Sequence, residues 1–536
     1  MEQRLKPMLL ALAASGCLAF SLPTVAGERE SLEQLRTTTL SLIELLVQEG
    51  VLSKDKAEAI VQQAESAKVQ SAAADEAEPV TAGNGDKTVR VQYVPEHVKK
   101  EMREEIKQEV MAKLNYKAGE RLGLPDWIDR IQWEGDMRLR YELDHFPDGN
   151  DPAFVFGTSE TRNAELSNTD EERNRFRVRA RLGAKLKLTD WLDGGIRMTT
   201  GKEDDPVSPN QTLETSDSKY SFALDRAYLR MTPVPWASVS GGRIENPYFS
   251  TDLVWDPDLA FDGAAAVFKP RFSDNWSVFG TLGAFILDEQ QSSEDTDARD
   301  KWLFGAQAGL QWQSADRSSV KLGVALYDFK NVEGKPNPLL SPGLYDNTVL
   351  AFRSKGNSTF SIDPTNQCGN GGLCGLASEF RELNLTGQID LATFSPVHVI
   401  LTADYVKNLG FDESEIAART GMPLGTYDEE TEGYQVRLAV GMPEVKSRHD
   451  WQVFGAYKRL EADAVLDAFT DSDFNLGGTN AEGWIVGASY GLDKNTWLSA
   501  RYFTSDEIIK WNQDTATLTG RKFGADVLLI DLNAKF

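Results

Sequence analysis

The stretch RNRFRVRARLGAKLKL, from Arg173 to Leu188, alternates cations with apolar residues along almost its whole length. Successive side chains of a β-strand point to opposite faces. As a strand, this stretch would present hydrocarbon on one face and a row of cations on the other: Arg173, Arg175, Arg177, Arg179, Arg181, Lys185 and Lys187. The pattern indicates a strand with water or anions on one side and an oily environment on the other.

The same period-two alternation recurs from Ile131 to the end of the chain. It predicts sixteen strands, at residues 131–144, 172–188, 191–203, 222–234, 236–246, 262–271, 275–289, 300–314, 317–330, 378–394, 397–409, 431–442, 448–463, 482–492, 495–506 and 520–536. Short connections such as TDW, SDN and LDKN alternate with long loops. That alternation is typical of outer-membrane barrels, whereas a soluble β-propeller or sandwich would not need it. We therefore predict an all-β fold, a transmembrane antiparallel β-barrel of about sixteen strands over 129–536.

The overall composition narrows the class of protein. The chain has 536 residues and a formal net charge of -25. Such acidity repels phosphate and argues against a general nucleic-acid binder. After the N-terminus, no apolar run approaches the ~18 residues that a membrane helix needs. A membrane-spanning form of this chain would have to be a closed barrel, which satisfies all of its backbone groups.

The N-terminal quarter of the chain follows a different pattern. Residues 1–26 read as a signal peptide, with a basic start, an apolar core and a small-residue cleavage site after Ala26; a lipoprotein site at Cys17 is the alternative. Residues 27–128 are expected to be helical, interrupted by a flexible linker at about 69–88. Within them an apolar residue recurs every four positions, which predicts a coiled-coil seam or an amphipathic helix on the protein's own surface: Val98, Met102, Ile106, Val110 and Leu114.

Five stretches resemble the "putative porin" family of proteobacterial outer membranes: EGVLSKDKAEAIVQQAE, VQYVPEHVKKEMREEIKQEV, LPDWIDRIQWEGDMRLRYEL, ERNRFRVRARLG and LVWDPDLAFDG. The resemblance runs over nearly the whole chain. It implies a β-barrel channel preceded by a helical segment in the periplasm. In outline the predicted barrel is similar to the sixteen-stranded general porins, which are commonly trimers and whose third long loop folds into the pore.

In such a barrel the cations of the alternating strands must face the lumen. A lipid-facing arginine near the middle of the bilayer costs ~2–4 kcal/mol, so several together would not be tolerated. Neighbouring strands repeat the pattern, and adjacent strands lie about 4.8 Å apart. We therefore predict one basic pore wall: Arg138, Arg140, Arg175, Arg177, Arg179, Arg181, Arg197, Arg226 and Arg230.

The third long loop, at about 247–261, combines carboxylates with bulky apolar side chains. A loop this apolar is not expected to stand free in water. Folded inward, it would form a constriction opposite the basic wall, and charges of this kind set selectivity in channels. The predicted constriction residues are Asp252, Trp255, Asp256, Asp258 and Asp262. Two alternatives stay open: the arginines pair with acids of other strands, or the acidic loop lies outside the barrel and binds divalent cations.

Other chemistry is sparse in the sequence. Cys368 and Cys374, in CGNGGLC, are candidates for a disulfide, with two free thiols as the alternative. The spacing is not a strong metal motif, and we predict neither a metal site nor a cofactor. The four histidines accompany no nucleophile elbow or zinc motif, so we predict that the chain is not an enzyme.

The sequence thus predicts an outer-membrane porin of a Gram-negative cell, a passive diffusion channel for small hydrophilic solutes. The expected partners are membrane lipids, the solutes and two further copies of the chain in a homotrimer. The N-terminal helices would add a contact to peptidoglycan or to a periplasmic partner, and no nucleic acid is expected. The alternatives are a selective channel for anions such as phosphate or organic acids, and a tether or adhesin without transport.

Overall fold

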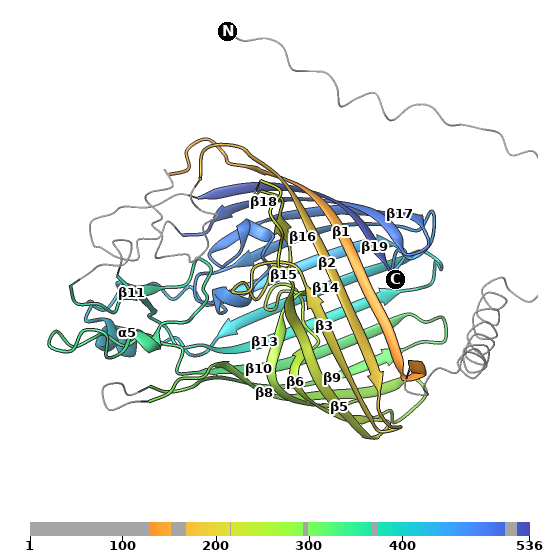
Figure 1. Ribbon diagram of the computed structural model, residues 1–536, viewed down its shortest axis with the longest axis horizontal. Coiled ribbons are helices and arrows are strands. Elements are labelled where there is room, and N and C mark those ends of the chain that lie inside the picture. Colours follow the sequence, from red (N-terminus) through yellow and green to blue (C-terminus); the bar gives the residue numbers. More distant parts are fainter. Residues whose placement is uncertain (1–127, 152–167, 215, 293–297, 366–371, 510–522) are drawn as a thin grey trace, which may run out of the picture. The chain divides into compact units, whose positions relative to one another are not determined.

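The computed structural model describes residues 128–151, 168–214, 216–292, 298–365, 372–509 and 523–536 (Figure 1). The predicted signal peptide, linker and coiled coil lie outside these residues. None of the described helices is long and apolar enough to cross a membrane.

The described chain is dominated by strands, and all sixteen predicted strands are present within a few residues of their expected bounds. They are β1 (Ile131–His145), β2 (Arg173–Lys187), β3 (Leu192–Thr199), β5 (Ala223–Val234), β6 (Ala237–Glu245), β7 (Ala260–Phe268), β8 (Trp276–Asp288), β9 (Lys301–Gln313), β10 (Ser319–Lys330), β13 (Arg381–Leu391), β14 (His398–Asn408), β15 (Glu432–Gly441), β16 (Trp451–Leu460), β17 (Ala481–Asp493), β18 (Thr496–Glu507) and β19 (Gly524–Lys535). The two-residue strand β4 (Gln211–Thr212) pairs with β2 from within the second long loop.

These strands form a closed antiparallel barrel. Each barrel strand pairs with the next one along the chain, and β1 also pairs with β19. In this last pairing Leu139 lies opposite Leu532, and Arg140 lies opposite Asp531. The predicted all-β barrel of about sixteen strands is confirmed.

The two faces of the barrel wall differ as the alternation in the sequence predicts. Phe176 and Leu139 are 62% and 53% exposed on the outside. Their neighbours Arg177 and Arg140, which are 8% and 1% exposed, point to the inside. Since side chains alternate across a strand, the register of β1 and β2 places all the arginines of these two strands on the inner face.

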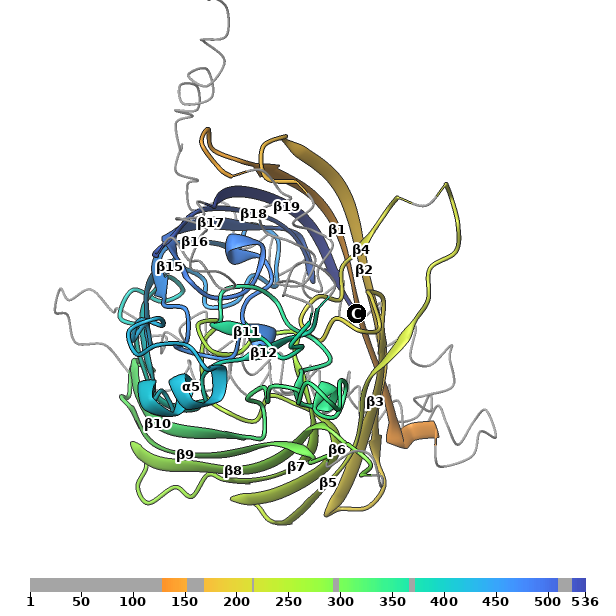
Figure 2. The ribbon, with the colours of Figure 1, turned by 90° about the vertical axis from the view of Figure 1, so that its left-hand side faces the viewer.

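The remaining elements are short, and all but η1, which directly precedes β1, belong to the long connections. They are β11 (Thr359–Ser361), β12 (Cys374–Leu376), α5 (Glu413–Thr420) and the 3₁₀ turns η1 (Ile128–Arg130), η4 (Asp346–Thr348), η5 (Asp467–Phe469) and η6 (Phe474–Leu476). Helix α5 is capped at its N-terminus by Asp412, whose carboxylate accepts hydrogen bonds from the N–H groups of Ser414 and Glu415. Figure 2 looks into the barrel from the end of the long loops and shows β11 and β12 over the interior of the ring.

An apolar cluster fills part of the barrel interior. It joins inward side chains of the wall with residues of the third loop (246–259) and the seventh loop (461–480). Among its members are Leu253, Trp255 and Leu466, all at most 2% exposed. The long loops therefore fold into the barrel and narrow it.

Candidate functional site

The inner face of β1 and β2 carries arginines directly opposite one another. Arg138 lies opposite Arg179, and Arg140 lies opposite Arg177. Like charges in such cross-strand positions repel one another. Carboxylates on the same face compensate for most of this repulsion, because these two strands also place Asp136 and Glu142 inside.

The compensation takes the form of short ion pairs. Asp136 accepts hydrogen bonds from Arg179 at 2.8 Å and from Arg181 at 2.7 Å. Glu142 accepts from Nε of Arg175 at 2.9 Å and from Arg177 at 3.2 Å. The predicted basic wall is therefore a mixed wall. These acids could have been predicted from the sequence, because Asp136 and Glu142 lie two and four positions from Arg138 and therefore share its face of the strand.

The third loop spans the barrel from β6 and β7 to the opposite side. The hydroxyl of Thr251 donates to Asp404 of β14 at 2.6 Å. Gln435 of β15 donates to Asp252 at 2.7 Å, and Lys458 of β16 donates to the Asp252 carbonyl oxygen at 3.1 Å. These three strands lie about half of the ring away from β6, so the loop crosses the lumen.

Aromatic rings fix the loop in place. Trp255 lies 5.1 Å from both Phe261 and Tyr327, measured between ring centroids. Tyr248, at the start of the loop, lies over Gly305 of β9, where a Cβ atom would be 2.1 Å from its hydroxyl oxygen. A glycine at this position of the wall is therefore required for the loop to approach so closely.

The seventh loop completes the site, and the sequence analysis did not assign it a role. Asp473 accepts from Arg140 at 2.8 Å and from Arg501 of β18 at 2.7 Å. The backbone N–H of Ser472 donates to Asp256 of the third loop at 3.0 Å. The two loops and the wall thus form one connected network of charges. The sequence signals for this contribution were the acidic turn TDSDFN and the bulky apolar residues of the same loop, such as Leu466 and Phe474.

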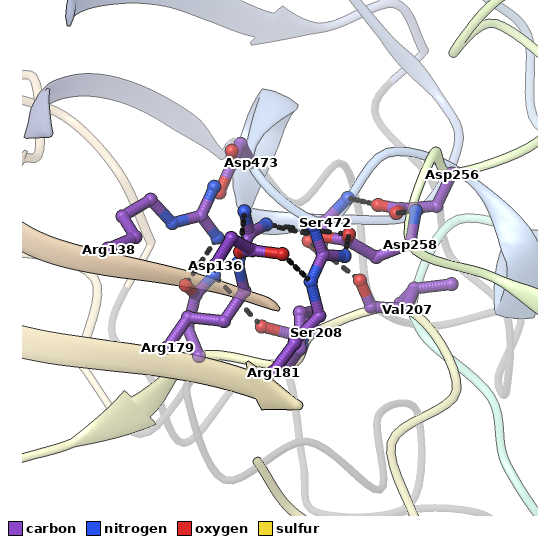
Figure 3. Close-up of polar contacts among 12 residues, drawn as sticks. Asp136, Arg138, Arg179, Arg181, Val207, Ser208, Asp256, Asp258, Ser472 and Asp473 are labelled. Carbon is purple, nitrogen blue, oxygen red and sulfur yellow. Dashed lines mark hydrogen bonds and ion pairs between the residues drawn. The ribbon is translucent and has the colours of Figure 1, made fainter. Parts of the chain in front are cut away.

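Between the wall and the two loops lies a cavity of about 530 Å³. Basic and acidic side chains of the described residues line this cavity in equal numbers. The basic ones are Arg138, Arg179, Arg181, Lys185, Arg197, Arg226, Arg501 and Lys535, and the acidic ones are Glu134, Asp136, Glu245, Asp252, Asp256, Asp258, Asp471 and Asp473. In Figure 3, Asp258 of the third loop faces Arg179 and Arg181 of β2. Asp258 accepts a hydrogen bond from Arg181 at 2.7 Å, so the cationic side of the cavity is in direct contact with the anionic side.

The loop carboxylates differ in their preferred charge state. Burial by itself raises the pKa of Asp258, but the charges of Arg179 and Arg181 outweigh burial and hold this pKa below its usual value. Burial, together with the negative charges of Asp258 and Asp471, raises the pKa of Asp256 well above its usual value. The third loop therefore presents two carboxylates with a lowered pKa, Asp252 and Asp258, and one with a raised pKa, Asp256.

The cavity unites only part of the predicted site. Arg138, Arg179, Arg181, Arg197 and Arg226 line it, as do Asp252, Asp256 and Asp258. The remaining basic residues, Arg140, Arg175, Arg177 and Arg230, lie outside its lining. Trp255 is buried in the apolar cluster and does not line the cavity.

Two further predictions concern residues at the edge of the site or away from it. The assignment of Asp262 to the constriction is wrong, because the residue lies in β7, as the predicted strand at 262–271 also has it, pairs with Arg243 of β6 at 2.6 Å and does not line the cavity. The strand starts early because Phe261 packs inward, 4.8 Å from Phe285. Cys374 of β12 is disulfide-bonded. Cys368 lies outside the described residues, so its pairing with Cys374 stays a prediction.

Comparisons with known proteins gave distant structural likenesses and one family match. A search of curated proteins gave no match. Among solved structures, a loop-deletion mutant of OmpT from Vibrio cholerae is 12% identical, covers 76% of this chain and 100% of its own, and gives a TM-score of 0.39. The outer membrane channel DcaP of Acinetobacter baumannii is 11% identical, with 76% and 97% covered and a TM-score of 0.39. OmpF of Salmonella typhi in complex with daunomycin is 10% identical, with 76% and 97% covered and a TM-score of 0.38.

The family comparison is more direct than the structural ones. The family model described as "Putative porin" matches residues 36–536, which is most of the chain and includes the whole barrel. The protein belongs to this porin family of outer-membrane channels.

Proposed function

We propose that the protein is a diffusion channel for small hydrophilic solutes, whose narrowest part is the cavity between the basic wall and the third and seventh loops. The observation that carries this proposal is the charged cavity inside a barrel whose outer face is apolar. Cations on one side and carboxylates on the other create a field across the path of a solute. Such a field admits polar and charged solutes and disfavours apolar ones.

Three finer features belong to the same proposal. The N-terminal segment lies in the periplasm, where it contacts peptidoglycan or a partner, and the channel conducts ions. The barrel assembles as a homotrimer in the outer membrane. The alternative of an anion-selective channel is favoured by one observation, the concentration of arginines on β1 and β2 at the cavity.

Conductance measurements on the purified protein in planar bilayers test the channel function. We expect discrete current steps in KCl, with a reversal potential in a salt gradient that reports the charge of the cavity. Arg179→Glu removes a positive charge and adds a negative one beside Asp136 and Asp258. It should raise the cation-to-anion permeability ratio at least ~5-fold, since one unit charge at 4 Å is worth ~1 kcal/mol even in water.

The matched control for this experiment is Lys187→Glu. Lys187 lies on the same strand, but its side chain is 70% exposed and outside the cavity. This variant should change the permeability ratio much less than Arg179→Glu. Absence of current from a correctly folded barrel would contradict the channel function and favour a tether.

The selectivity should also depend on pH through Asp471 of the seventh loop. Burial raises the pKa of Asp471 to about 6. The negative charges of Asp252 and Asp473 add to this rise, and the positive charge of Lys458 opposes it. As pH falls from 7.5 to 5, the cavity therefore loses a negative charge, and we expect anion permeability to rise relative to cation permeability. Because the folded-state pKa exceeds the ordinary value of 3.8, the same protonation stabilises the folded state as pH falls from about 6 to about 4.

The variant Asp471→Asn tests the assignment of this pH effect. It should show at pH 7.5 the selectivity that the native channel shows at pH 5, and the step near pH 6 should disappear. A step of unchanged size in Asp471→Asn would assign the titration to another group.

A further inference from the structure

Arg138 differs from the arginines around it in having no carboxylate partner among the described residues. Arg179 and Arg181 both bind Asp136 and Asp258, and Arg140 binds Asp473 and Asp531. Arg138 donates only to the side-chain oxygen of Asn210, and its Nε is buried with no hydrogen-bond acceptor. The residue is 9% exposed and lines the cavity.

A buried cation without a partner is costly, and folded proteins almost always pair such a group. The surroundings of Arg138 increase the cost, because Arg179 lies directly opposite on β2 and Arg140 is next on the same face of β1. The nearby carboxylates of Asp258 and Asp473 attract Arg138 but make no hydrogen bond to it, since their oxygens bind other cations. The guanidinium thus keeps a terminal nitrogen, Nη1, that has no hydrogen-bond partner among the described residues.

The charges of the cavity indicate what that ligand carries. Basic and acidic side chains are equal in number among those that line the cavity. Among the arginines of this lining, Arg138 is the one without a carboxylate partner in the described residues, so a single negative charge on a ligand would complete the pairing. A second negative charge on the ligand would meet the ionised Asp258 and Asp473, which also line the cavity.

We propose that Arg138 is the binding point for the carboxylate of a small monocarboxylate solute, held in the constriction during its passage. This inference rests on the proposed channel function. A guanidinium binds a carboxylate through charge-assisted hydrogen bonds from adjacent N–H groups. Asn210 accepts from Nη2 of Arg138, which leaves Nη1 as the terminal nitrogen available to a ligand. A volume of about 530 Å³ accommodates a small solute with its hydration water.

The test uses the full processed chain in planar bilayers and in liposomes, with acetate, succinate and inorganic phosphate as probes. In the native channel, acetate added to KCl should reduce the chloride current in a saturable way. Arg138→Gln should weaken this saturation about tenfold, since a hydrogen bond to a charged group contributes ~1.5–3 kcal/mol. Arg138→Lys keeps the charge but loses the paired donors, so it should restore only part of the binding. Lys187→Gln, outside the cavity, should leave saturation by acetate unchanged.

The outcomes separate this inference from the channel function. Each variant is first shown to form a heat-modifiable barrel and to pass glycerol into liposomes. If the native barrel passes neither glycerol nor KCl, the channel function fails. If it passes both, three results would overturn the role of Arg138: no saturation by acetate, equal saturation in Arg138→Gln, or tighter binding of succinate or phosphate than of acetate.

Discussion

Replacing Trp255 by alanine will lower the free energy of unfolding by ~3–5 kcal/mol and increase the single-channel conductance. The indole is 2% exposed and touches rings from three different parts of the chain: Phe261 of β7, Tyr327 of β10 and Phe469 of the seventh loop. Its loss leaves a cavity at the point where the third and seventh loops meet. Because both loops narrow the lumen, their separation should widen the path for ions.

Urea unfolding in lipid vesicles measures the stability change, and current steps in KCl measure the conductance. Trp236→Ala is the matched control, because this tryptophan is 50% exposed. It should lose far less stability than Trp255→Ala and should conduct like the native channel. A Trp255→Ala channel with native conductance would contradict the role of the third loop in narrowing the lumen.

Replacing Arg140 by alanine will destabilise the barrel by a similar amount, ~3–5 kcal/mol, because in a poorly solvated site Asp531 loses its nearest cation and Asp473 loses one of its two cations. Asp531 binds Arg140 at 2.7 Å and Asp473 binds it at 2.8 Å. Their side chains are 5% and 13% exposed. Release of Asp473 also frees the seventh loop from β1, so a higher conductance should accompany the loss of stability.

Arg230→Ala provides the comparison for this variant. Arg230 also pairs with a carboxylate across the sheet, at 2.9 Å from Asp193, but its side chain is 46% exposed. An exposed pair of this kind contributes ~0–1 kcal/mol. Urea unfolding of the two variants under the same conditions should therefore show a large difference, and equal losses would mean that burial of the Arg140 pair has no energetic weight.

The barrel was predictable because its signal is local. In Arg173–Leu188 and in each later strand, the alternation of side chains with period two reveals the strand, its length and its sidedness at once. The start of β7 was placed two residues late, because inward packing of Phe261 on Phe285 is a tertiary contact that no local pattern reveals.

The charged cavity was only partly predictable, for the same reason. Inward folding of the third loop follows from its apolar side chains, and Asp258 does meet the arginines of β2. The seventh loop has a similar local signal in Val465, Leu466 and Phe474, which was not used, because the acidic turn TDSDFN was interpreted as solvated. Its exact place is set by Arg501, two strands further on, and by Arg140, which lies 333 residues away in the sequence. That Arg138 has no carboxylate partner among the described residues likewise becomes clear only when its neighbours in the folded structure are known.

The seam between β1 and β19 has a consequence for how the protein is made. Phe536 exchanges backbone hydrogen bonds of 3.0 and 3.2 Å with Gly135, and Arg140 meets Asp531 across a separation of 391 residues. Contacts so distant in sequence form late, because the intervening chain must first be ordered. Until then both terminal strands are open edges that invite aggregation. The two terminal strands must therefore be shielded during transit from the ribosome to the membrane, until β19 pairs with β1.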